Sequence, residues 1–254
     1  MEAFVSDPAV LFIVLLVLFS AAVAFGAVIL RRVVPLPDDE RDNFNVVQTA
    51  TFTLLALVIG FSLSMAVSRY DQRKNLEEEE ANAIGTEYAR SNLADASAKA
   101  QIKAALVRYT RLRLEDYQTR KSQELARIGR DTAALQSELW ELATQVPRDK
   151  PTPIGAIIVT GMNDVLNSQD YTEAARINHI PIEVWFLMIL IALFGCVVQG
   201  YGVKGKVRKG LLVTILPVTI SLSLALIADI DSPRAGVIRV QPQNLARLLQ
   251  SLQK

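Results

Sequence analysis

The sequence has very few of the residues on which thiol and metal chemistry usually depends. It contains one cysteine, Cys196, and one histidine, His179, among 254 residues. A single cysteine excludes an intramolecular disulfide and a cluster of metal-binding thiolates. A single histidine excludes the paired imidazoles of the common zinc sites. We therefore expect no bound metal and no cofactor.

Signs of catalysis and of nucleic-acid binding are missing as well. The sequence has no complete Walker loop, no H-E-x-x-H and no G-x-S-x-G motif. It offers no second histidine or cysteine from which to build a nucleophile and its base. The 27 basic and 26 acidic residues leave a net charge of +1, which argues against a polyanion-binding surface. We expect a protein that is not an enzyme and has no catalytic residues.

Long apolar runs, in contrast, are a prominent feature of this chain. Each of four runs has about 18–22 residues, so a helix of that length approaches the ~30 Å thickness of the bilayer hydrocarbon. Because lipid offers the backbone no hydrogen-bond partners, these runs must be helical. The sequence therefore predicts an all-α protein with four transmembrane helices: Ala9–Leu30, Thr49–Ser68, Ile182–Tyr201 and Leu211–Ala228.

Basic residues near the spans carry the information on orientation. Two short loops have most of them: Arg31, Arg32 and Arg41 after the first span, and Lys204, Lys206, Arg208 and Lys209 after the third. The positive-inside rule then puts these loops in the cytoplasm and the insert between the second and third spans outside. The basic residues on the opposite side favour the reverse orientation: Arg69, Arg73, Lys74 and Arg234.

The insert, residues 69–180, has the pattern of an antiparallel helical bundle. Its first helix continues out of the second span to about Asn92, and Asp95 is a suitable N-cap for a second helix ending near Arg120. Alternating spacings of three and four residues predict a third helix with a heptad seam: Leu125, Ile128, Thr132, Leu135, Leu139, Leu142 and Val146. A fourth helix follows the prolines at 147–153, with one apolar face: Ile154, Ile158, Met162 and Val165.

These elements divide the chain into four parts. Residues 1–68 hold the first helix pair, 69–180 the bundle, 181–230 the second pair, and 231–254 a tail with a short amphipathic helix. Within the bundle, the acidic run Glu77–Glu80 is interpreted as a solvated helix face. Consecutive helical residues point about 100° apart, so four adjacent carboxylates do not converge on one cation.

Two groups of membrane residues are candidates for function. Small and hydroxyl side chains recur on the second and fourth spans, and they suit either close helix packing or the lining of a pore: Thr49, Thr53, Gly60, Ser64, Thr214 and Ser221. The first and third spans are more aliphatic, and we expect them to face lipid. Ionisable residues at the ends of the spans form a predicted charged collar: Arg69, Glu183, Asp229 and Asp231.

Two motifs resemble one known family. Gly60–Tyr88, GFSLSMAVSRYDQRKNLEEEEANAIGTEY, resembles the segment in which a membrane helix runs into an E-A-N-A-x-G stretch in the bacterial bestrophin-like family. The C-terminal Asp231–Pro242 is similar to that family's ending, D-x-P-x-x-G-x-I-x-V-x-P. The resemblance covers nearly the whole chain, and the family is named for kinship to anion-channel bestrophins.

The resemblance implies a multi-pass protein of the bacterial inner membrane, with the insert on the periplasmic side if the basic loops set the orientation. We expect a homo-oligomeric, bestrophin-like ion channel or channel-like pore, with the lipid bilayer and small inorganic ions as partners and no nucleic acid. The alternative is a membrane-anchored helical scaffold, or an interaction or sensing module, without transport activity.

Overall fold

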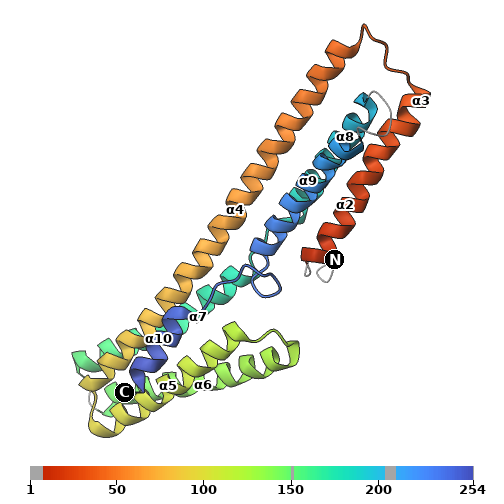
Figure 1. Cartoon of the computed structure of the whole chain (residues 1–254). Coiled ribbons are helices and arrows are strands. Elements are labelled where there is room, and N and C mark those ends of the chain that lie inside the picture. The colour runs from red at the N-terminus through yellow and green to blue at the C-terminus, as the bar shows by residue number, and fades with distance from the viewer. Residues whose placement is uncertain (1–7, 150–151, 204–209, 254) are drawn as a thin grey trace. The chain divides into compact units, whose positions relative to one another are not determined.

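The computed structural model describes residues 8–149, 152–203 and 210–253, and every regular element within these ranges is a helix (Figure 1). The chain divides into two compact units. The membrane unit consists of Met1–Ser68 and His179–Arg239. The extramembrane unit consists of Arg69–Asn178 and Val240–Lys254. The C-terminal tail is thus shared between them.

Four helices have the length and apolar composition to cross a membrane, as predicted. The first is α2 (Pro8–Phe25), which continues through a π-helical turn, η1 (Gly26–Leu30), into α3 (Arg31–Val33). The others lie in α4 (Arg41–Arg90), α8 (Ile182–Gly202) and α9 (Gly210–Asp231). Apolar composition alone was enough to place them, because the one charged residue in the four runs, Glu183, lies at the very start of the third.

The membrane unit is organised around α2, which packs against both α8 and α9. A row of α2 side chains at spacings of four residues is buried in these contacts: Leu11, Leu15, Phe19 and Val23. The opposite face of α2 is open, with Val17 65% exposed. The expectation that the first and third spans only face lipid was therefore incomplete, since each of them has one packed and one exposed face.

The extramembrane unit holds the C-terminal half of α4, the short η2 (Ser91–Leu93), α5 (Ala96–Gln118), α6 (Ser122–Asp149), α7 (Pro153–Ile177) and α10 (Gln243–Leu252). Paired side chains connect α4 to α5 and α6 to α7. Arg113 of α5 pairs with Glu80 of α4, and Gln136 of α6 donates to Gln169 of α7.

Local capping sets the starts of two of these helices. The Asp95 carboxylate accepts hydrogen bonds from the backbone N–H groups of Ser97 and Ala98, which confirms the predicted N-cap of α5. The hydroxyl of Thr152 accepts from the N–H of Gly155 and starts α7. Pro153 follows at the first helical position, where its missing N–H is not needed.

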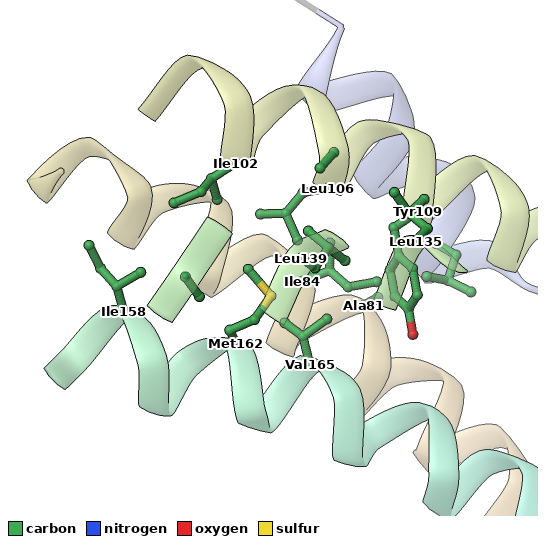
Figure 2. Packing of buried hydrophobic residues seen from close by; sticks show 13 residues of the cluster. Ala81, Ile84, Ile102, Leu106, Tyr109, Leu135, Leu139, Ile158, Met162 and Val165 are labelled. Atoms are coloured by element: carbon green, nitrogen blue, oxygen red, sulfur yellow. The ribbon is translucent and has the colours of Figure 1, made fainter. Parts of the chain in front are cut away.

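Apolar side chains from α4, α5, α6, α7 and α10 meet in one core (Figure 2). The predicted seam of α6 points inward, with Ile128, Leu135 and Leu139 buried, so it serves this chain's own core. On α7, Ile158, Met162 and Val165 are fully buried. Ile154 was wrongly assigned to this face: it is 43% exposed, because it lies in the first turn of α7, beyond the core.

Candidate functional site

A row of mostly polar side chains on α4, ending at Ser91 of η2, faces the inside of the extramembrane unit. Its positions are spaced by four and three residues, like the apolar seam of a coiled coil, but most are ionisable: Arg73, Glu77, Glu80, Ile84, Glu87 and Ser91. We call this row the α4 polar seam. The interpretation of Glu77–Glu80 as a solvated face was wrong for Glu77 and Glu80, which are 1% and 0% exposed. Glu78 and Glu79, which point elsewhere on the helix, are exposed.

Glu77 holds the C-terminal helix. Its Oε1 accepts hydrogen bonds from the backbone N–H groups of Asn244 and Leu245, at 3.0 and 2.9 Å. Its Oε2 accepts from the side-chain amide of Asn244 at 2.7 Å. These N–H groups belong to the first turn of α10, where no intrahelical acceptor exists and the helix dipole favours an anion. A carboxylate 167 residues away in sequence therefore caps α10.

Glu80 is the centre of a buried ionic network. It accepts from the guanidinium of Arg113, and the hydroxyl of Thr172 lies 3.5 Å from its Oε2. Asp116 joins the network through Arg113, 3.5 Å away, and also pairs with Arg176. The guanidinium of Arg176 lies 4.2 Å from the centre of the Tyr117 ring. Buried charges are tolerated only when paired in this way. The network links α4, α5 and α7 through fixed polar contacts.

Glu87 differs from the other two buried carboxyls. It is fully buried, and neither of its oxygens has a hydrogen-bond partner within the described part of the chain. Burial raises the pKa of Glu87 from 4.5 to about 8, against the attraction of Arg90 and with a further rise from Asp164. The one sequence signal for Glu87 is its position seven residues after Glu80. That spacing did not mark Glu87 as buried, because this face of α4 has no apolar periodicity.

In the membrane unit, the predicted pore-lining residues of α4 lie on an open face. Thr49, Thr53 and Ser64 are exposed, and nothing lies within 4 Å of a Cβ built on Gly60. The Thr53 hydroxyl donates to the carbonyl of Thr49 at 2.9 Å, so the helix itself satisfies this donor. The two candidates on α9 differ from each other: Thr214 is exposed, whereas Ser221 is fully buried.

The predicted collar residues of α9 bind backbone groups of their own unit. Asp229 accepts from the N–H groups of Val237 and Ile238, at 2.7 and 2.8 Å. Gly236 directly precedes Val237, and a Cβ there would approach the Asp229 carbonyl oxygen to 2.4 Å. The two Asp229 bonds fold the segment after α9 back onto its end. This contact gives a structural role to Gly236, the glycine of the C-terminal motif.

Asp231 also binds a backbone N–H group, just before the start of α8. Its carboxylate accepts from the N–H of Ile180, and Nδ1 of His179 lies 3.4 Å from its Oδ2. Glu183 is exposed in the first turn of α8. Arg69 belongs to the extramembrane unit, so its pairing with Asp229 stays a prediction.

Neither metal nor nucleotide chemistry finds support in the described residues. They contain no group of three His, Cys, Asp or Glu side chains able to hold a metal ion. The stretch from Gly200 to residue 205 reads G-Y-G-V-K-G, a spacing used for dinucleotides when it follows a strand. Here Gly200 and Gly202 belong to the membrane helix α8, and Gly200 packs against the backbone of α2.

Comparisons with a family model and with solved structures both find bestrophin-like proteins. The model of the bestrophin-like domain matches residues 12–245. Among solved structures, a bacterial bestrophin homologue from Klebsiella pneumoniae phased with zinc aligns with a TM-score of 0.65 and 15% identity, covering 94% of this chain and 97% of that one. A tryptophan-to-alanine variant of the Klebsiella homologue aligns with a TM-score of 0.68 and 13% identity, covering 95% and 93%.

A leucine-to-threonine variant gives a TM-score of 0.65 at 14% identity, covering 95% of this chain and 98% of that one. No curated protein matches this chain. At these identities the solved structures establish the fold, and the domain match extends over most of the sequence. The chain therefore belongs to the bestrophin-like family of membrane proteins.

Proposed function

We propose that this protein is a homo-oligomeric ion channel whose pore is lined by the open face of α4, with α9 contributing near it. The observation that carries the proposal is the low burial of α4 within its own unit. Of the most apolar 18-residue stretch of α4, 17% is buried, against 50% in α9. A membrane helix that contacts so little of its own chain has a face free for other copies.

Hydroxyl groups interrupt that face, which also exposes the apolar side chains of Val46, Leu57 and Val67. Thr49, Thr53 and Ser64 place hydroxyl groups along it, and Gly60 leaves the backbone accessible. Hydroxyl oxygens can replace part of the hydration shell of a passing ion. Membership of the bestrophin-like family and the fold shared with bacterial bestrophin homologues support the same function.

Single-channel recording of the purified protein in planar bilayers tests the proposal. We expect discrete currents, and we expect Thr53→Val and Ser64→Val to change conductance or selectivity by removing hydroxyls from the lining. Thr51→Val is the matched control, because it removes a hydroxyl from the same helix about 160° away from Thr53 around the axis. The Thr51 hydroxyl donates to the carbonyl of Val47.

Assembly is measured independently by the mass of the protein in mild detergent. We expect a species of several times the 28.0 kDa chain mass. A monomer under all conditions would contradict both the oligomer and the pore. An oligomer that conducts no ions in bilayers would favour the membrane-anchored scaffold instead.

A further inference from the structure

The Glu87 carboxyl occupies a place that the fold leaves free only because residue 161 is glycine. Glu87 extends from α4 toward α7, where Gly161 is buried. A Cβ built on Gly161 would lie 1.9 Å from Oε2 of Glu87. The same Cβ would lie 2.4 Å from Nη1 of Arg90. The acid and the guanidinium are therefore close neighbours above one glycine.

These two groups are near each other without being paired. Neither oxygen of Glu87 receives a hydrogen bond from the described residues. Arg90 instead faces Asp164 of α7, with Nη1 3.9 Å from Oδ2. The charged groups acting on Glu87 are thus Arg90 of its own helix and Asp164 of the helix packed against it. Glu77 and Glu80, in contrast, each accept from donors that stabilise the ionised form.

A fully buried carboxylate without donors is much less stable than the neutral acid. Desolvation disfavours the charged form, and the raised pKa of Glu87, about 8, has burial as its main cause. A protonated carboxyl needs only one acceptor for its hydrogen, and it carries no net charge. The missing Cβ of Gly161 leaves the space that the carboxyl occupies, and the charge of Arg90 only partly offsets the effect of burial.

We propose that Glu87 is a proton-binding site within the extramembrane unit, occupied at neutral pH, and that loss of its proton loosens the contact between α4 and α7. Ionisation produces a carboxylate that requires donors. The nearest is Arg90, three residues along the same helix. When Arg90 turns to Glu87, Asp164 loses its cation, and the ionic contact between the two helices is replaced by one within α4.

Infrared difference spectroscopy of the full-length protein between acidic and alkaline pH tests the site directly. We expect a protonated-carboxyl C=O band that disappears as pH rises through about 8, and that is absent in Glu87→Gln. Glu78→Gln is the matched control, because Glu78 is exposed on the same helix and its removal should leave this band unchanged. Gly161→Ala should displace the carboxyl and shift the transition to lower pH.

Thermal stability provides the second measurement. The folded pKa of Glu87 lies above its unfolded value of 4.5, so its contribution to stability is complete below pH 4.5 and is lost as pH rises toward 8. Over that interval the folding equilibrium constant of the wild type should fall roughly tenfold per pH unit relative to Glu87→Gln. The melting temperature of the wild type should therefore fall relative to that of Glu87→Gln as the pH rises.

Three results would overturn the proposal. A band that titrates identically in the wild type and in Glu87→Gln would assign it to another acid, and parallel pH profiles of stability would exclude a buried proton at Glu87. Stabilisation of the wild type, but not of Glu87→Gln, by Na⁺ or Ca²⁺ at constant pH would make the site a cation site instead.

Discussion

Gly26 and Gly200 face each other where α2 and α8 cross, with their backbones in direct contact. A Cβ on Gly26 would lie 2.1 Å from the carbonyl oxygen of Val197, and one on Gly200 would lie 2.0 Å from that of Val23. Close approach of this kind strengthens helix association in lipid, where packing rather than water exclusion holds helices together. The π-helical turn η1 begins at Gly26, so the irregular turn of the first span coincides with this contact.

Gly200→Ala should therefore destabilise the membrane unit by about 1–3 kcal/mol or more, since backbone atoms cannot move aside as a side chain would. Thermal unfolding of the purified protein measures the effect. Gly60→Ala is the control, because a Cβ there meets nothing within 4 Å. Equal melting temperatures for the two variants would mean that the helices do not approach this closely.

Removing the capping carboxylate of Glu77 should release the C-terminal helix. Glu77→Ala leaves the N–H groups of Asn244 and Leu245 without their acceptor, a loss of about 1 kcal/mol or more for a helix cap. We expect faster tryptic cleavage at Arg247, which lies in α10. Glu78→Ala, which alters an exposed neighbour, should be cleaved at the wild-type rate.

The buried pair of Glu80 and Arg113 should behave as a unit. Arg113→Met leaves Glu80 buried without its main partner and should cost about 3–5 kcal/mol of stability. The double variant with Glu80→Gln should lose clearly less than the sum of the single losses. Arg127→Ala serves as the comparison, because its pairs with Glu115 and Asp131 are solvent-exposed and its loss should not change the melting temperature measurably. Strictly additive losses at Glu80 and Arg113 would contradict coupling.

Orientation can be tested with positions that the structure shows to be accessible. In a Cys196→Ser background, Gly129→Cys lies at an exposed point of α6 with no atoms nearby. The orientation predicted from the basic loops makes this thiol react with an impermeant reagent on intact cells. Asp39→Cys, in the loop before α4, should then react only after permeabilisation. The reverse pattern would put the extramembrane unit in the cytoplasm.

The positions of the spans and of the main helical segments followed from local sequence. Twenty apolar residues in a row have few alternatives to a membrane helix, and the Asp95 cap acts on residues two and three positions away. The seam of α6 could also be predicted, because all its members except Thr132 are apolar and burial in a core requires only apolar side chains of suitable size. Each of these features depends on neighbours in sequence or on nonspecific burial.

Only the tertiary structure decided which charged residues are buried. Glu77, Glu80 and Glu87 lie in one seam, yet the first caps α10, the second pairs with Arg113, and the third has no donor among the residues that the structure describes. Those partners lie between 33 and 168 residues away, and the space above Gly161 depends on how α7 approaches α4. The apolar pattern of α4 predicts a helix, but the free energy of burying a charge depends on donors that only the fold brings to it.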